Sequence, residues 1–265
     1  MTRTLQIVRA FAGREARLRP RLATELGFFA LEAALPVVTL WQLSRMMGVP
    51  VAGMRDYLTF AGPASVLLLF TLAAMLSATG AAARARHSGA FDALMLTAAT
   101  PMSVALGLVV YPASSMFLRA LMACGLLVAF GVMPLGWGAL AALVSLVLAF
   151  AVAVTAAMLL QAAAILGTGV MRIGVLVVII GVMLSGALFP LTALPGALAG
   201  ATELLPFRAM AQAMRLSYSG APPASLTQAW TTLLLWLALL APLSWMALEA
   251  AFRRARRSGR VRAAI

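Results

Sequence analysis

Six long apolar runs dominate this sequence and limit the class of protein that it can form. A lipid bilayer has a hydrocarbon core about 30 Å thick, which a helix crosses with about 20 apolar residues. The chain of 265 residues has six runs of about that length or longer, at 26–46, 58–82, 103–131, 138–166, 173–194 and 226–250. Only 10% of its residues are charged, against about 25% in soluble domains. We therefore predict an all-α membrane protein with six transmembrane helices.

The arginines between the runs predict the orientation, because cytoplasmic flanks of membrane helices accumulate basic residues. All 20 basic residues are arginine. Fifteen of them would share one side: Arg3, Arg9, Arg14, Arg17, Arg19, Arg21, Arg84, Arg86, Arg172, Arg253, Arg254, Arg256, Arg257, Arg260 and Arg262. Only Arg45, Arg55, Arg208 and Arg215 would lie on the other side. Both termini are therefore expected to be cytoplasmic, and the net charge of +13 does not require nucleic-acid binding.

Several kinds of chemistry are not expected of this chain. It has no lysine, so it has no Walker A motif with which to bind ATP and no Schiff-base nucleophile. His87 and Cys124 are the single histidine and the single cysteine, too few for a disulfide or a Cys/His zinc site within one chain. We expect no catalytic, cofactor-binding or metal-binding residues, and a role in transport or scaffolding.

The segment before the first run predicts an amphipathic helix over residues 3–18. Ile7, Val8 and Phe11 fall on one arc, and the arginines fall on the other. Such a helix lies on a membrane surface, and Pro20 would end it. We assign 1–25 as a cytoplasmic interface helix; the alternative is an unstructured basic tail. Because six arginines precede the first run, and Glu32 lies within it, a cleaved signal peptide is not expected.

The connection 84–101 predicts a short cytoplasmic helix over residues 88–99, with Ser88 as its N-cap and Pro101 as its stop. Asp92 would lie near its positive end. Phe91, Leu94 and Met95 would share one apolar face, which either binds a partner or packs on the chain's own spans. His87, beside this helix, is expected to be a surface residue.

The connection 185–223 is too apolar for a solvated loop and too interrupted for a span. Pro190, Pro195 and Pro206 divide it, and residues 207–218 predict an amphipathic helix that includes Met210 and Met214. Such segments re-enter the outer leaflet or lie on it. The predicted re-entrant region also contains Gly196 and Arg208.

Arg119 lies near the middle of the predicted span 103–131. An arginine at the centre of a membrane helix costs about 2.5–3.5 kcal/mol on insertion scales, so it requires a partner. Glu32 is the candidate partner, with Gln161 as a neutral alternative. The pair would either lock two helices together or let Arg119 contact an anionic substrate head group.

Three stretches carry a resemblance to a known family. They are 57-YLTFAGPASVLLL-69, 89-GAFDALMLTAATPMSVALG-107 and 185-SGALFPLTALP-195 with the later Pro206 and Arg215. In this order, and with six spans, the chain resembles the permease subunits of type-2 ABC exporters. It is most similar to the branch that exports nodulation lipo-oligosaccharides and daunorubicin-type drugs. It departs from that branch at Leu205, where the family often has Asn, and at Ala99, which alters the Thr-Pro spacing.

The resemblance implies a bacterial cytoplasmic-membrane exporter that moves an amphipathic, lipid-like, glycolipid or drug-like cargo outward. Residues 26–250 would form the permease domain and 251–265 a basic cytoplasmic tail. Phe91, Asp92, Leu94 and Met95 would form the coupling helix that docks on an ATPase subunit, and 195–218 the re-entrant elements. The chain itself would not be an enzyme. Two ATPase chains would bind ATP and Mg²⁺, and a second permease, identical or paralogous, would complete the transporter together with membrane lipid.

Three alternatives remain open at this point. A haem or other small-molecule exporter would have the same fold. An intramembrane protease would need a Ser and a His at similar depth, but Ser185 and His87 are predicted near opposite faces. A channel or secondary transporter would carry more ionisable residues at the midplane than Arg119 and Glu32.

Overall fold

The computed structural model describes residues 22–48, 54–87, 100–132, 136–190, 200, 202 and 205–257. These residues form seven helices of at least 13 residues and no β-strand. The helices are α2 (Leu22–Met47), α3 (Tyr57–His87), α5 (Pro101–Ala129), α6 (Trp137–Leu166), α7 (Thr168–Met183), α9 (Pro206–Tyr218) and α10 (Pro223–Arg257). The all-α prediction is confirmed for this part of the chain.

Five of these helices, α2, α3, α5, α6 and α10, are long and apolar enough to cross a membrane. They coincide with five of the six predicted spans. Large apolar side chains lie exposed on their outer faces, among them Phe28 and Leu31 in α2 and Leu235 and Met246 in α10. An apolar surface of this extent is costly in water and matches lipid. The chain is therefore a multi-pass membrane protein.

The predicted span 173–194 is not one continuous helix. Helix α7 begins at Thr168, directly after Gly167, and ends at Met183 after 16 residues, a rise of about 24 Å. The chain then turns at Gly186, whose φ of 74° suits a glycine. The Ser185 hydroxyl stabilises this turn by donating to the Val182 carbonyl (2.6 Å) and accepting from the Ala187 amide (3.3 Å). Arg172, predicted in a connection, lies within α7 instead.

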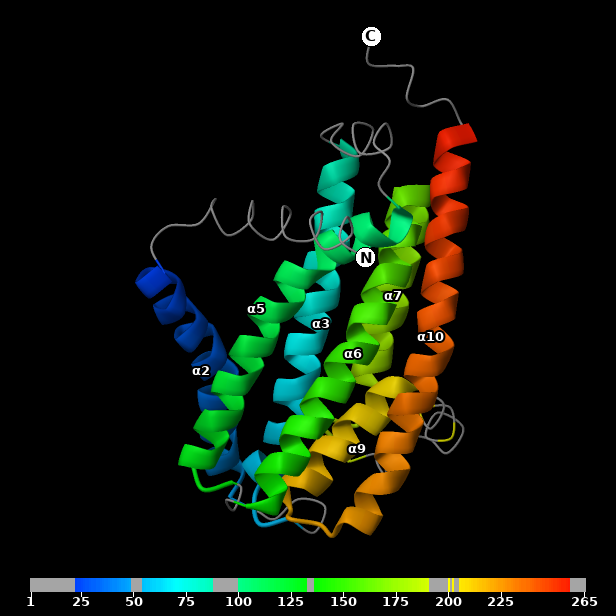
Figure 1. Cartoon of the computed structure of the whole chain (residues 1–265). Helices are drawn as coiled ribbons and strands as arrows, with labels where there is room; N and C mark the ends of the chain where they lie inside the picture. Colours follow the sequence, from blue (N-terminus) through cyan, green and yellow to red (C-terminus); the bar gives the residue numbers. More distant parts are fainter. Residues whose placement is uncertain are drawn as a thin grey trace.

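Helices α3 and α6 form the centre of the bundle. Helix α6 packs against α3 and α10, α3 packs against α5, and α2 lies on the outside against α5 and α3 (Figure 1). Small residues such as Ala61, Ala64, Ala149 and Ala153 are fully buried at these contacts. Small side chains allow helix backbones to approach closely, which is how membrane helices gain packing energy.

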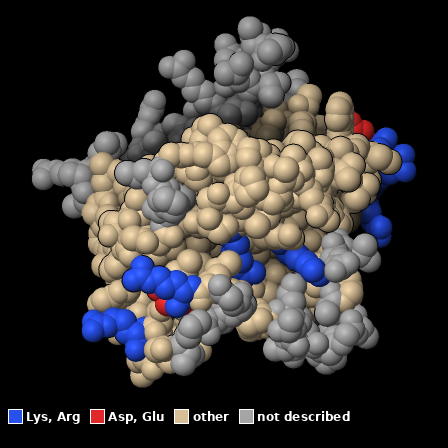
Figure 2. Space-filling model, turned by 90° about the horizontal axis from the view of Figure 1, so that it is seen from below, with Lys and Arg blue, Asp and Glu red and all other residues tan. Residues whose placement is uncertain are grey.

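The two ends of the bundle differ in charge. At the upper end in Figure 1, α3 and α10 finish with Arg84, Arg86, Arg254, Arg256 and Arg257 in their last turns. Helix α10 continues to Arg257, so residues 251–257 of the predicted cytoplasmic tail 251–265 are helical. At the lower end, seen in Figure 2, arginines form separate patches on a mostly uncharged surface.

Helix α9 is the short amphipathic helix predicted over 207–218. It lies in the lower half of the bundle, packed against α3, α6 and α10 (Figure 1). Its buried face includes Phe207, Met210, Met214 and Tyr218. A helix of 13 residues therefore occupies space between longer helices instead of lying free in a loop.

Several predictions concern segments that lie outside the described residues. These are the interface helix over 3–18 and the coupling helix over 88–99 with Phe91, Asp92, Leu94 and Met95. Pro195 and Gly196 of the predicted re-entrant region also lie outside them.

Candidate functional site

Arg119 is buried in the middle of α5 and is paired with Glu32 of α2. The Arg119 side chain is 6% exposed, and its Nε faces the Glu32 Oε2 in an ion pair. The guanidinium also lies over the Phe29 ring, 3.8 Å from the ring centre. Phe29 and Glu32 are three residues apart on α2, so one face of that helix supplies both partners. The carboxylate offsets a charge that would be costly to bury alone.

Gln161, the neutral alternative partner, has a different role. Its Nε2 donates to the Ala78 carbonyl oxygen at 3.2 Å, so it joins α6 to α3. The structure therefore brings Arg119 together with Glu32 and not with Gln161.

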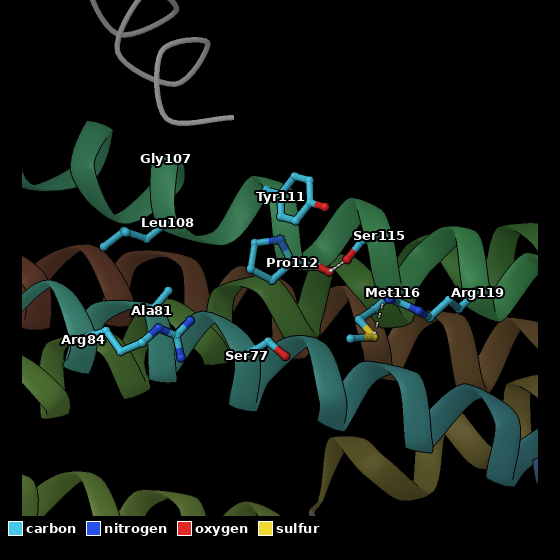
Figure 3. A pocket seen from close by; sticks show the side chains of 10 residues that line it. All are labelled: Ser77, Ala81, Arg84, Gly107, Leu108, Tyr111, Pro112, Ser115, Met116 and Arg119. Carbon is cyan, nitrogen blue, oxygen red and sulfur yellow. Dashed lines mark hydrogen bonds between the residues drawn. The ribbon is translucent and has the colours of Figure 1, made fainter. Parts of the chain in front are cut away.

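A cavity of about 180 Å³ opens beside Arg119, between α3 and α5 (Figure 3). Its lining residues are Ser77, Ala81 and Arg84 from α3 and Gly107, Leu108, Tyr111, Pro112, Ser115, Met116 and Arg119 from α5. Arg84 and Arg119 lie at its two ends, and their side chains extend inward from them. The lining thus has two guanidinium groups and three hydroxyl groups but no carboxylate.

Helical spacing explains why these side chains meet. Ser77, Ala81 and Arg84 lie at i, i+4 and i+7 on one face of α3. On α5, Leu108, Tyr111, Ser115 and Arg119 repeat at three- and four-residue steps along a facing stripe. Arg84 and Ser77 were not predicted as site residues, because an arginine at a helix end is fully explained by membrane topology. The sequence feature that could have indicated this cavity is the spacing of the polar residues Tyr111, Ser115 and Arg119 along one face of α5.

Hydrogen bonds from Arg215 connect three segments in the lower half of the bundle. Arg215 of α9 donates from Nε to the Phe60 carbonyl oxygen (2.9 Å) and from Nη2 to those of Ala187 (2.9 Å) and Gly186. Burial lowers the pKa of Arg215 to about 10, and the neighbouring Tyr57 opposes the shift. At neutral pH the guanidinium therefore stays charged and binds three carbonyl groups from two segments.

A chain of hydrogen bonds joins α10, α6 and α9. Trp230 Nε1 donates to Ser145 Oγ (2.9 Å), which lies 3.1 Å from Ser217 Oγ. Ser217 donates to the Ala213 carbonyl oxygen at 2.7 Å. Because the Ser217 proton is used there, Ser145 is the donor to Ser217. Ser145 and Ser217 are fully buried and Trp230 is partly buried, so these bonds tie α9 to α6 and α10 inside the bundle.

An apolar groove of about 290 Å³ runs between α2, α3 and α7. Leu40, Leu68 and Met183 are among its lining side chains. Its one buried polar atom without a hydrogen-bond partner in the described structure is the Ser65 hydroxyl. The groove can therefore receive an apolar chain, and offers it almost no polar contact.

The described members of the predicted re-entrant region have structural contacts. Pro206 is the first residue of α9, a position that suits proline because its missing amide hydrogen is not needed there. Arg208 donates to the Thr202 hydroxyl at 3.3 Å. Pro190 is half-buried beyond the turn that follows α7. None of the three lines either cavity.

Among the described residues, no group of three or more His, Cys, Asp or Glu side chains is placed to hold a metal ion. Comparison of the chain with protein-family models, curated proteins and solved structures finds no match.

Proposed function

We propose that this chain is the transmembrane permease subunit of an ATP-driven type-2 ABC exporter in a bacterial cytoplasmic membrane. Its cargo would be amphipathic: lipid-like, glycolipid or drug-like. The proposal starts from the ordered sequence resemblance over 57–69, 89–107 and 185–195. It includes six spans, with α7 and the turned segment after it forming the fifth.

The observation that carries the proposal is the placement of α9. This short helix is packed among α3, α6 and α10, at the end opposite the terminal arginines of α3 and α10. If the arginine-rich end is cytoplasmic, as basic flanks favour, then α9 lies toward the outer face. A re-entrant element before the last span fits a permease that closes its path on that side.

The cytoplasmic end would hold the partner interface. Arg84 and Arg86 end α3 directly before the segment 88–99, which we propose as the coupling helix on sequence grounds. Phe91, Leu94 and Met95 would enter an apolar groove on the ATPase, with Asp92 near the helix start. Closure of two ATPase chains on ATP would then move two permeases through these helices.

The two cavities support an amphipathic cargo. One is polar and positively charged, between α3 and α5, and the other is apolar, between α2, α3 and α7. A cargo with a polar head and an apolar body could use surfaces of both kinds.

Co-purification tests the proposal. A tagged chain expressed in its native host should retain an ATPase subunit with Walker motifs through detergent extraction. Phe91→Asp should release that subunit because it places a charge in the docking groove, whereas the matched control Phe91→Leu should retain it. Retention of the ATPase by Phe91→Asp would overturn the coupling-helix assignment, and transport without any ATPase would favour a secondary transporter.

A further inference from the structure

We infer that the cavity between α3 and α5 binds the oxyanion of an anionic amphiphile, such as a phosphate or carboxylate head group, through Arg84 and Ser77. This inference deepens the proposed function by assigning a class of head group, and it can be tested without the ATPase.

The two ends of the cavity differ in charge. Arg119 at one end is neutralised by Glu32, but no described carboxylate contacts Arg84 at the other end. Arg86, two residues on, turns away and donates to the Ala164 carbonyl oxygen at the end of α6 (3.0 Å). The cavity therefore has one uncompensated positive charge, supplied by Arg84.

The Arg84 side chain points back along its own helix. An arginine in the last turn of a membrane helix usually extends outward to the aqueous interface. Arg84 instead folds back along α3, so that a Cβ on Gly80 would lie 3.2 Å from its Nη1. Figure 3 shows its guanidinium extending along the cavity toward Ser77. Gly80, one turn earlier, leaves room for this conformation, in which the Arg84 side chain lines the cavity and is still exposed.

The serine hydroxyl groups of the cavity differ in their hydrogen bonds. Within the described chain, the Ser77 hydroxyl has no hydrogen-bond partner, whereas Ser115 donates to the Pro112 carbonyl oxygen at 3.0 Å. A serine in a helix commonly donates to the carbonyl one turn back. Ser77 does not, so its hydroxyl and the Arg84 guanidinium both leave hydrogen-bond donors available in the same cavity. Donors of this kind bind an oxyanion through charge-assisted hydrogen bonds.

The size and depth of the cavity suit a lipid head group. A cavity of about 180 Å³ is smaller than the roughly 300–1,000 Å³ of sites for drug-sized ligands. It therefore holds one head group and not a whole amphiphile. Helix α3 has 31 residues and rises about 46 Å, more than a hydrocarbon core of about 30 Å. Its last turns, with Arg84, therefore reach the level of lipid head groups.

The test measures binding of fluorescent dioctanoyl phosphatidic acid to the purified full-length permease in neutral detergent, with fluorescent dioctanoylglycerol, which has the same acyl chains and no oxyanion, as the uncharged comparison. Arg84→Gln should weaken binding of the acid at least about tenfold, since hydrogen bonds to charged groups are the strong ones. Gly80→Ala keeps every charge and favours the helix, yet crowds Arg84, and should weaken binding a few-fold. Arg172→Gln removes an exposed arginine of α7 outside the cavity and should leave binding unchanged.

Competition by inorganic phosphate identifies the source of the oxyanion. Displacement of the probe at millimolar phosphate means that the cavity accepts a free anion, and displacement only by unlabelled phosphatidic acid means that acyl chains are required; either result keeps the site. Equal losses in Arg84→Gln and Arg172→Gln, or equal binding of both lipids, would overturn the inference. Loss of the site with an ATPase still co-purifying would leave the proposed function intact.

Discussion

The guanidinium of Arg215 in α9 lies 4.1 Å from the centre of the Phe60 ring in α3 and donates to the carbonyl oxygen of the same residue. One side chain thus binds both the ring and the backbone of a residue 155 positions away. Because it also binds the turn after α7, it holds three segments of the lower bundle together.

Replacing Arg215 should destabilise the fold. Arg215→Gln removes charge-assisted hydrogen bonds and leaves the buried carbonyl groups of Gly186 and Ala187, in the turn after α7, without their Arg215 donor. Each unsatisfied buried group costs about 1–3 kcal/mol, so thermal unfolding in detergent should occur at a clearly lower temperature. Arg55→Gln, at an exposed arginine of the same end, is the control. Equal melting temperatures for the two variants would contradict a fastening role.

The pairing of Arg119 with Glu32 predicts non-additive effects. Glu32→Gln leaves a buried guanidinium without its counter-ion, and breaking a buried ion pair by removing one partner costs up to about 3–5 kcal/mol. The cost here should be smaller than that, because the Glu32 side chain is 53% exposed. The double variant Arg119→Gln with Glu32→Gln should be more stable than Glu32→Gln alone, as a double-mutant cycle of denaturant unfolding would measure.

Exchange of the same two charges separates structure from transport. If Arg119→Glu with Glu32→Arg restores folding and also restores export, the pair only locks α2 to α5. If it restores folding and export stays lost, Arg119 also contacts the cargo.

The hydroxyl chain in the bundle core predicts a specific dependence on Ser145. Ser145→Ala removes the acceptor of the Trp230 indole N–H and should cost about 1–3 kcal/mol of stability. It should also change the fluorescence of Trp230. Ser114→Ala, at an exposed serine that donates only to the Tyr111 carbonyl, should do neither. In a Trp230→Phe background the effect of Ser145→Ala on stability should shrink; an undiminished effect would show that the indole bond is not the cause.

The orientation of the bundle can be tested by thiol labelling. Cys124, the only cysteine, is replaced by alanine, and single cysteines are placed at exposed Ser225 and His87 at opposite ends. In intact cells a membrane-impermeant maleimide should label Ser225→Cys and not His87→Cys until the membrane is permeabilised. The reverse pattern would place the arginine-rich end outside.

The sequence predicted the elements defined by long-range hydropathy and missed those defined by single contacts. Continuous apolar runs predicted six spans because membrane insertion depends on length and composition, and five of the six are long apolar helices. Hydropathy did not predict that α7 ends at Met183, because this end depends on the local turn at Ser185 and Gly186. The helix over 206–218 was predictable from its period, but its burial depends on Arg215 and Ser217 reaching other helices.

In the candidate site, too, the sequence predicted some residues and missed others. The cost of a membrane arginine pointed to Arg119 and to Glu32 as its partner. The place of Arg84 in the cavity could not be separated from the topology signal, since it depends on the side chain folding back over Gly80, which the sequence does not show.

The most direct test of the central claim is the composition and activity of the complex that this chain forms. The tagged chain is purified from its host membrane, its native mass is measured, and Mg²⁺-dependent ATP hydrolysis is assayed in the same fraction. We predict two permease chains, this one at 27.7 kDa, with two ATPase subunits and hydrolysis that is lost with Phe91→Asp. A chain that purifies without any ATPase, in a fraction that hydrolyses no ATP while export in cells continues, would contradict the account.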